Sequence, residues 1–204
     1  MKIAVLSNEN TYQELTELPN QIIWLRVASI DSLLQAIEVD ALINLNEDAG
    51  EKNYSSTNLP VFVNSVSQTL KENNHTKNIV RINGWQGFLK RSCWEISGQL
   101  SRDHEAILTL MEKSFSLFPD EPGFVSARII AMIINEAYFA KEEQISTEEE
   151  IDTALKLGTN YPKGPFEWGK EIGQKNVYSL LKKLSLLDKR YTPSKLLEAE
   201  ALQS

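Results

Sequence analysis

The chain has 204 residues, of which 42% are hydrophobic and 24% charged, and its formal net charge is −7. This composition supports a buried core and excludes a disordered chain, and the length allows one large domain or two small ones. Because neither half is basic, nucleic acid and anionic membranes are excluded as expected partners. One cysteine and two histidines exclude an internal disulfide and a zinc site of cysteine and histidine, so no metal is expected.

The apolar runs of the chain are short throughout. The first residues lack the continuous apolar stretch of a signal peptide, and no stretch approaches the ~20 apolar residues of a membrane-spanning helix. We therefore expect a soluble, cytoplasmic protein without a membrane segment.

The first hundred residues alternate between short apolar runs of strand length and short stretches typical of helices. Strands separated by helices favour a parallel sheet built from βαβ units. A polar surface loop at residues 47–58 takes the place of one crossover helix, so the sheet is a reduced one. The predicted strands are residues 2–7, 21–27, 41–46, 59–64, 78–83 and 93–97, and the predicted helices are residues 12–18, 31–37 and 65–72.

From Ser101 onward the sequence predicts helices only. Ser101 can cap a helix that reaches about residue 116, and prolines and acidic residues at 119–122 then break the chain. Residues 123–143 form the longest predicted helix, which is apolar on more than one side. Because one small domain cannot cover so much apolar surface, we expect a homodimer through this helix. Further helices are predicted from the cap Ser146 to residue 157, from Pro165 to Gly173 and over 177–187.

Several short motifs follow one another in the helical half. They are Pro122-Gly123-Phe124-Val125, Asn135-Glu136-Ala137, Ile151-Asp152-Thr153-Ala154, Tyr161-Pro162-Lys163-Gly164-Pro165-Phe166 and Arg190-Tyr191-Thr192-Pro193-Ser194. In this order and spacing, residues 122–200 closely resemble the C-terminal domain of 3-hydroxyacyl-CoA dehydrogenases. The first half resembles the dinucleotide-binding domain of that family more faintly, at residues 61–67 and 82–97.

The resemblance implies an α/β plus all-α organisation. A reduced Rossmann-like parallel sheet domain is expected over residues 1–100, and an all-helical, dimerising domain over residues 101–204. In the family, the first domain binds NAD and an acyl-CoA lies in a cleft between the domains. A histidine is the general base for the 3-hydroxyl group, a glutamate orients it, and a serine and an asparagine hold the substrate oxygen or the histidine.

The residues at the expected NAD site depart from the family pattern. A dinucleotide needs closely spaced glycines at the first strand-to-helix turn, but residues 8–12 contain none and the first glycine of the chain is Gly50. The second strand ends near Arg26 instead of at an acidic residue that would hold the ribose, and Glu9 would repel a phosphate. The residues therefore predict no cofactor, and NAD is implied by the resemblance alone.

Of the family's catalytic positions, only Glu95 keeps its identity. Asn83 stands where the histidine should be, Val66 replaces the serine and Ala127 replaces the asparagine. Asparagine does not titrate and cannot act as a general base. The alternative interpretation of Glu95 is an ordinary carboxylate at a strand end. The candidates for lining a substrate cleft are Ser67, Asn83, Tyr161 and Phe166, although the prolines and glycine at 162–165 indicate a mainly structural segment.

Two further side chains have reactive groups. His104 lies in the first turn of a predicted helix between two acidic residues, and we expect it to be solvated. Cys93 lies in an apolar strand, and we expect it to be a small core residue.

The leading interpretation is a 3-hydroxyacyl-CoA dehydrogenase homologue without NAD binding or dehydrogenase activity. Such a pseudoenzyme would act as a dimeric accessory protein or as a binding protein for an acyl-CoA-like small molecule. One alternative is an active 3-hydroxyacyl-CoA dehydrogenase of fatty acid metabolism that binds its cofactor unconventionally or takes its nucleotide domain from another chain. The other alternative is a structural dimer without a ligand.

Overall fold

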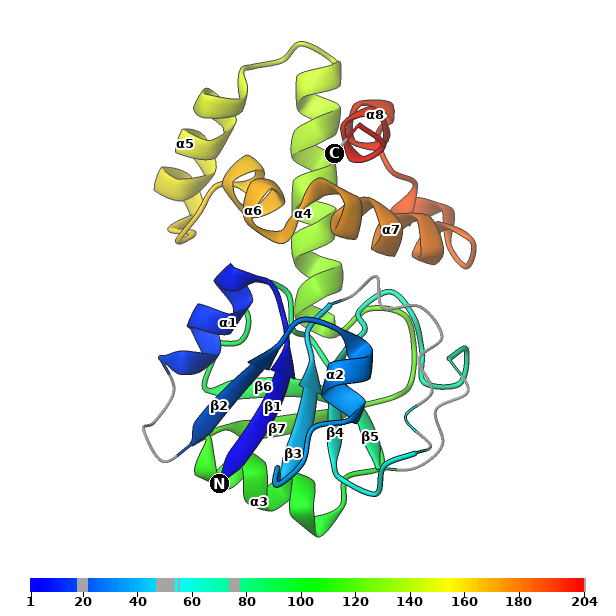
Figure 1. The fold of residues 1–204 in the computed structure, drawn as a ribbon. Coiled ribbons are helices and arrows are strands. Elements are labelled where there is room, and N and C mark those ends of the chain that lie inside the picture. The colour runs from blue at the N-terminus through cyan, green and yellow to red at the C-terminus, as the bar shows by residue number, and fades with distance from the viewer. Residues whose placement is uncertain (18–21, 47–53, 55, 74–77, 204) are drawn as a thin grey trace. The chain divides into compact units, whose positions relative to one another are not determined.

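The computed structural model describes residues 1–17, 22–46, 54, 56–73 and 78–203. The chain separates into two compact units, Met1–Phe124 and Val125–Ser204. The first unit is a seven-stranded sheet with helices on both faces, and the described part of the second unit contains only helices (Figure 1). The predicted α/β plus all-α fold class is confirmed. No helix in the described ranges is long and apolar enough to span a membrane.

The sheet of the first unit has the strand order β2-β1-β3-β4-β5-β6-β7. All neighbouring strands are parallel except β5 and β6. The six predicted strands are confirmed, and a seventh is added at one edge. The strands are β1 (Lys2–Leu6), β2 (Ile23–Val27), β3 (Ala41–Asn44), β4 (Val61–Asn64), β5 (Ile79–Ile82), β6 (Cys93–Gly98) and β7 (Ser114–Phe118).

The antiparallel pairing of β5 and β6 differs from the parallel sheet that we predicted. Val80 lies opposite Gly98, and Ile82 lies opposite Ile96. Residues 83–92, which connect the two strands, form turns and bends instead of a helix. A parallel pair needs a crossover of about a dozen residues or more, so this short connection returns the chain in the opposite direction.

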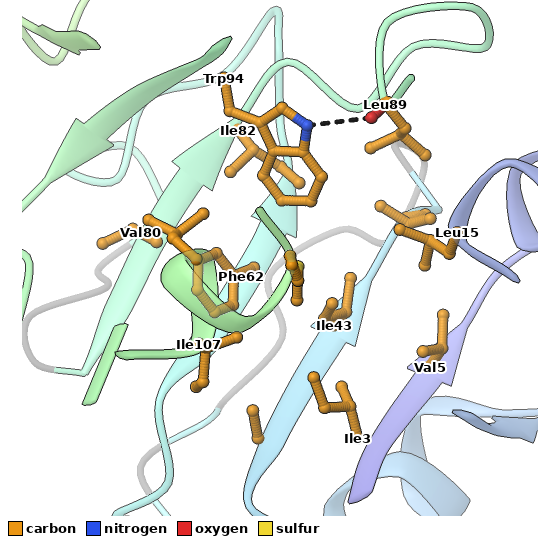
Figure 2. Close-up of a cluster of buried hydrophobic side chains, with 14 of the residues drawn as sticks. Ile3, Val5, Leu15, Ile43, Phe62, Val80, Ile82, Leu89, Trp94 and Ile107 are labelled. Atoms are coloured by element: carbon orange, nitrogen blue, oxygen red, sulfur yellow. Dashed lines mark hydrogen bonds between the residues drawn. The ribbon is translucent and has the colours of Figure 1, made fainter. Parts of the chain in front are cut away.

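Successive side chains along each strand point to opposite faces of the sheet. Because the strands consist mostly of apolar residues, an apolar core forms on each face. Helices α1 (Glu9–Thr16) and α3 (Arg102–Leu110) contribute Leu15 and Ile107 to the core on one face. Figure 2 shows this core, in which the indole nitrogen of Trp94 donates a hydrogen bond of 3.0 Å to the Leu89 carbonyl. Helix α2 (Ile30–Leu34) contributes Leu33 to the core of the other face.

Helix α3 begins at its predicted cap but ends before residue 116, where we predicted its end. The Ser101 side chain accepts a hydrogen bond from the backbone of His104, as expected of a cap. Glu112 then takes a left-handed conformation with φ of 55°, which is typical of the residue just beyond a helix. Residues 114–118 consequently continue as β7, parallel to β6. The segment from Ser101 to Phe124 therefore lies within the first unit.

The helix predicted over 65–72 is wrong, because the described residues there form turns and bends. Their backbone amides are bound from outside: the Asp120 carboxylate accepts hydrogen bonds of 3.0 Å from the amides of Leu70 and Lys71. The polar loop predicted at 47–58 falls mostly on residues outside the described ranges.

The second unit contains the predicted long helix and several shorter ones. The predicted cap at Ser146 is off by one residue, because Thr147 and Glu150 form the capping box. That helix ends at Thr159, and its C-cap Asn160, with a φ of 55°, replaces the stop predicted near Gly158. The helices are α4 (Val125–Glu142), α5 (Glu148–Thr159), α6 (Pro165–Ile172), α7 (Gln174–Ser185), η1 (Lys189–Tyr191) and α8 (Lys195–Ala201), and α8 was not predicted.

Asp152 on α5 fixes the start of α6. Its carboxylate accepts hydrogen bonds from the backbone amides of Phe166 at 2.8 Å and Glu167 at 3.2 Å. A Cβ atom on Gly164 would lie 2.2 Å from the Asp152 carboxyl carbon, so only glycine fits at this contact. The structural interpretation of residues 162–165 is thus supported by the local geometry.

Asn135 on α4 holds the segment before α8. Its amide nitrogen donates to the Thr192 carbonyl at 2.9 Å, and its amide oxygen accepts from the Ser194 backbone at 2.9 Å. The side chain of Asn135 is buried, so both bonds are shielded from water. Two of the motifs that resemble the dehydrogenase family are therefore joined by hydrogen bonds.

His104 is not solvated, contrary to our expectation. Its side chain is 0% exposed and packs edge-on against Phe62, with ring centroids 5.0 Å apart. The ring nitrogen Nδ1 accepts a hydrogen bond of 3.2 Å from the Ser101 backbone, so the proton of the neutral ring lies on Nε2. Burial of the His104 ring lowers its pKa, and hydrogen bonding to the backbone of Val61 and Asn78 opposes this effect to a smaller extent.

We predict that Gly164→Ala destabilises the second unit by about 2–4 kcal/mol, because the added methyl group displaces Asp152 from the amides that it caps. The measurement is chemical denaturation followed by far-UV circular dichroism. Gly158→Ala is the matched control, since beyond the two neighbouring residues and the local helix backbone its added Cβ meets nothing within 4 Å. That control should be neutral or slightly stabilising, and equal losses in both variants would contradict the role of Asp152.

We also predict a loss of stability on mild acidification that depends on His104. In the unfolded chain this group titrates near 6.5, and its pKa is lower in the folded protein. Below pH 6.5 the unfolded state therefore binds more protons, and stability falls by up to about 1.4 kcal/mol per pH unit until the folded-state pKa is reached.

Urea denaturation between pH 8 and pH 5 measures this effect, with the non-titrating variant His104→Gln as the reference. The difference in unfolding free energy between the two proteins should shrink as the pH falls. A difference that stays constant over this range would contradict a buried neutral histidine.

Candidate functional site

The candidate site lies at the carboxyl ends of the parallel strands in the first unit. The strand order reverses between β1 and β3, and ligands of open α/β sheets bind at the carboxyl edge beside such a reversal. Polar residues end or follow four of the strands at this edge. They are Asn8 after β1, Asn44 in β3, Asn64 in β4 and Asn83 after β5.

The turn between β1 and α1 is closed by its own side chains. Asn8 is the cap of α1, and its amide oxygen accepts a hydrogen bond of 2.9 Å from the Thr11 backbone. Glu9, in the first helical turn, forms an ion pair with Arg26 of β2. Arg26 also donates to the Ser7 carbonyl at 3.3 Å. Helix N-termini can bind phosphate groups. At the N-terminus of α1, however, the Asn8 side chain already binds a backbone amide, and the Glu9 carboxylate adds a negative charge.

Asn64 links three strands at the carboxyl edge. Its amide nitrogen donates to the Leu45 carbonyl after β3 at 3.1 Å, and its amide oxygen accepts from the Gly84 backbone after β5 at 2.9 Å. A Cβ atom on Gly84 would lie 2.9 Å from the Asn64 Cβ, so the close approach requires glycine. The edge is therefore held together by a side chain at the end of β4.

Asn44 makes a similar link further along the edge. Its amide nitrogen donates to the Tyr54 hydroxyl at 2.8 Å, and its oxygen accepts from the Asn46 backbone at 3.0 Å. Burial raises the pKa of Tyr54 to about 12, against a smaller opposing effect of Asn44. The tyrosine is therefore neutral at physiological pH and cannot serve as a base there.

The structure brings Asn83 and Glu95 together. The Asn83 amide nitrogen donates to the Glu95 carboxylate at 3.0 Å, and the Asn83 backbone donates to the Glu95 carbonyl at 3.3 Å. The antiparallel return from β5 to β6 creates this contact between residues twelve positions apart. Asn83 is buried and Glu95 is half-buried, so the pair combines one carboxylate with an amide that does not titrate.

The other first-unit candidates lie in the turn after β4. Val66 is buried, and its carbonyl accepts a hydrogen bond of 2.7 Å from the Gly123 backbone. Ser67 follows it and is half-buried. A contact of Ser67 with a substrate stays a prediction.

The remaining candidates belong to the second unit. Ala127 is buried in α4. Phe166 is 2% exposed, and its ring packs against Tyr138 with centroids 5.0 Å apart. Tyr161 is half-buried and packs against Trp168 at 5.4 Å. Phe166 thus contributes to the helical core, and the ligand roles of Tyr161 and Phe166 stay predictions.

The expectation that Cys93 is a core residue is wrong. Cys93 is exposed, since Trp94 and Ile96 are the β6 side chains that face the core. Its sulfur lies 3.5 Å from the Ser116 hydroxyl. Within the described residues, no group of three or more histidine, cysteine, aspartate or glutamate side chains is placed to hold a metal ion.

Sequence reasoning missed the bridging role of Asn64 and the contact of Asn44 with Tyr54. The available signal was the recurrence of asparagine at successive strand ends, where parallel strands place polar groups at one edge. It also missed the ion pair of Glu9 with Arg26, although both residues had been noted as unfavourable for NAD.

The family model and the curated relatives that match this chain belong to the same family. Residues 123–202 match the family described as 3-hydroxyacyl-CoA dehydrogenase, C-terminal domain. The 3-hydroxyadipyl-CoA dehydrogenase of Escherichia coli K12 is 40% identical over 106 residues, which are 50% of this chain and 22% of that protein. The 3-hydroxybutyryl-CoA dehydrogenase of Clostridioides difficile is 37% identical over 110 residues, and the match covers 39% of it. The matched segments are thus well under half the length of these relatives.

Solved structures share the fold. The (S)-3-hydroxybutyryl-CoA dehydrogenase of Ralstonia eutropha superposes with a TM-score of 0.67 at 17% identity, covering 99% of this chain and 93% of that chain. A 3-hydroxybutyryl-CoA dehydrogenase of Escherichia coli K12 superposes with a TM-score of 0.58 at 29% identity, covering 80% of this chain and 32% of that one.

We predict that Asn64→Ala destabilises the first unit by about 2–4 kcal/mol, because two buried backbone groups lose their partners at once. Urea denaturation measures the change. Asn46→Ala is the control, since the Asn46 side chain is exposed. If both variants unfold at the same urea concentration as the unchanged protein, Asn64 does not hold the edge.

Proposed function

Because the chain belongs to the 3-hydroxyacyl-CoA dehydrogenase family through its C-terminal domain, we propose that it is a member without hydride-transfer chemistry. In this proposal it acts as a dimeric accessory protein or as a binding protein for an acyl-CoA-like ligand. The contact between Asn83 and Glu95 carries the proposal.

The dehydrogenase reaction needs a base where this chain has an amide. Oxidation of a 3-hydroxyacyl thioester moves a hydride from C3 to the nicotinamide and the hydroxyl proton to a base, and a C3 carbonyl forms. In this proposal Asn83 stands at the position of that base, and a neutral amide does not accept the proton. Glu95, which would orient a histidine, instead accepts a hydrogen bond from Asn83 at 3.0 Å.

The first strand-to-helix turn does not fit the pyrophosphate of NAD. A bound pyrophosphate would need the α1 amides, but the Asn8 side chain already takes the Thr11 amide. The phosphates would also meet the carboxylate of Glu9, which Arg26 holds at the helix start. We therefore assign no step of a reaction to a nicotinamide in this chain.

The helical unit supports the binding part of the proposal. Its family motifs position backbone segments through Asp152 and Asn135, and neither contact requires a cofactor. We propose that an acyl-CoA-like ligand is the small molecule held by this protein. Considered separately, the proposed ligand residues are Ser67 and Asn83 on the first unit and Tyr161 on the second, whereas Phe166 lies in the helical core.

The outer face of α4 supports a homodimer. Val125 is 51% exposed and Ile129 is 55% exposed, and they lie one turn apart on the helix predicted to dimerise. Apolar side chains grouped in this way mark an association surface. We therefore propose a homodimer through residues 123–143.

A second candidate function is an active dehydrogenase that takes its nucleotide domain from another chain. The observation in its favour is the length of the Escherichia coli relative, of which the match covers only 22%. Mixing this protein with an intact dehydrogenase of the family distinguishes the candidates. Turnover above that of the intact enzyme alone would favour the second one.

We predict no turnover of 3-hydroxyacyl-CoA thioesters with NAD by the purified protein, measured as nicotinamide absorbance over several acyl chain lengths. The double variant Asn83→His with Ala127→Asn should not restore activity, because the turn at Asn8 is unchanged. Steady turnover of the unchanged protein that disappears in Glu95→Gln would contradict the proposal.

Ligand binding is tested by the shift in melting temperature with NAD, CoA and acyl-CoA thioesters, each added separately. A ligand at 100 times its dissociation constant stabilises the native state by about 2.7 kcal/mol. We expect a shift with acyl-CoA and none with NAD. A shift with NAD would remove the basis of the proposal, and no shift with any compound would favour a structural dimer without a ligand.

A further inference from the structure

We infer that two copies of the chain pair edge to edge through β2, antiparallel and centred on Leu25, so that their two sheets become one. This inference goes beyond the proposed function, because the surface lies in the first unit and does not involve residues 123–143. The observations that carry it are the open outer side of β2, the direction of its backbone groups and the side chains along it.

The outer side of β2 has no neighbouring strand. β2 forms one edge of the sheet, and β1 is its single strand neighbour in the part of the chain that the structure describes (Figure 1). In dinucleotide-binding sheets of order 3-2-1-4-5-6, a further strand lies outside the second one. Here α2 leads from β2 directly to β3 on the other side of β1, so the described residues leave that position open. An open edge can pair with a strand of another molecule.

The backbone groups of alternate residues in β2 point to this open side. The Ile23 amide donates to the Met1 carbonyl at 2.8 Å, so every second residue from Ile23 onward directs its amide and carbonyl toward β1. Trp24 and Arg26 lie between these residues and direct their backbone groups outward. The Trp24 carbonyl accepts a hydrogen bond of 3.3 Å from the Tyr12 hydroxyl, and a carbonyl oxygen can accept a second one.

Antiparallel pairing about Leu25 uses these outward groups. It places Trp24 opposite Arg26 of the partner subunit, where the two residues exchange both of their backbone hydrogen bonds. Two-fold symmetry makes the same pair a second time. On the other face, Ile23 lies opposite Val27 of the partner subunit. The strand is therefore complementary to itself in this register.

The side chains of β2 also fit a position inside a sheet. Ile23 is 65% exposed, whereas Trp24 and Leu25 are half-buried against the two cores. Pairing covers Ile23 with the partner's Val27 and places the Trp24 ring beside the partner's Arg26. Apolar pairs and arginine beside an aromatic ring are cross-strand contacts that stabilise sheets.

The charge on β2 does not oppose pairing. Edge strands are commonly protected from association by unpaired charges, lysine above all, and by proline. The only charged residue of β2 is Arg26, which forms an ion pair with Glu9 and lies over the Tyr12 ring at 5.3 Å. Each copy therefore brings an arginine whose charge is balanced within its own chain, and β2 contains neither lysine nor proline.

A lysine on the edge tests this surface. Ile129→Asp is the background, since it opposes association through α4 and leaves β2 unchanged. We expect this protein to form a dimer, and adding Ile23→Lys should raise the dissociation constant by at least tenfold, because the ammonium group loses water opposite Val27. The measurement is sedimentation equilibrium at 0.1 M salt. Leu117→Lys is the matched control, because Leu117 is 58% exposed on the opposite edge strand β7.

Cross-linking tests the register independently. In a Cys93→Ser background, a mixture of the Ile23→Cys and Val27→Cys proteins should form a disulfide between the two, since directly opposite residues of this kind have Cα atoms about 4.5 Å apart. Ile23→Cys alone should not, because its two copies lie four residues apart along the strands, or about 13 Å. Parallel pairing would give the reverse result, and far-UV circular dichroism checks that each variant is folded.

The outcomes separate this inference from the proposed homodimer. A monomeric Ile129→Asp protein overturns the pairing of β2 and leaves the homodimer through α4 standing, whereas an Ile23→Lys protein that is monomeric without Ile129→Asp supports β2 and overturns the α4 dimer. Equal association with and without Ile23→Lys, or a disulfide in Ile23→Cys alone, overturns the inference. An edge that binds an intact dehydrogenase of the family instead of a second copy overturns it as well.

Discussion

The first unit depends on one buried charge, the guanidinium of Arg81 on β5. Its side chain is 0% exposed, donates to Asp120 at 3.0 Å and to the Glu121 carbonyl at 2.9 Å, and packs over the Phe124 ring at 5.0 Å. Removing one partner of a buried ion pair costs about 3–5 kcal/mol, so the segment after β7 has little choice of position. Since Asp120 also binds amides of the turn after β4, one ion pair fixes the sheet, that turn and the chain that leads into α4.

The second unit is also organised by side chains that bind backbone groups. Asp152 binds the amides at the start of α6, and Asn135 binds the backbone on either side of Pro193. These side chains position the backbone through hydrogen bonds. A chain can therefore keep the dehydrogenase framework in its helical unit while Asn83 stands beside Glu95 in the other, because the two requirements fall on different residues.

The sequence predicted six strands from their apolar runs, and β1, β3, β4 and β5 are buried on both faces of the sheet, which makes these runs recognisable without knowledge of their neighbours. It missed β7, because Phe115 continues the helical spacing of Ile107 and Met111, and only the conformation of Glu112 decides where the helix stops. His104 was misjudged for a related reason: acidic neighbours in sequence indicate solvent, but the helix lies on the sheet and buries the ring.

The pairing of Asn83 with Glu95 could be predicted from the family resemblance, whereas the bridge made by Asn64 depends on three strands and has no local signal. The position of β7 at the edge of the sheet has a consequence for behaviour in concentrated solution. An edge strand offers unpaired backbone groups to other molecules, and Leu117, 58% exposed, adds an apolar side chain to that edge. Pro119 follows directly and has no amide hydrogen to donate, so an intermolecular sheet that begins at β7 is interrupted after the five residues of this strand.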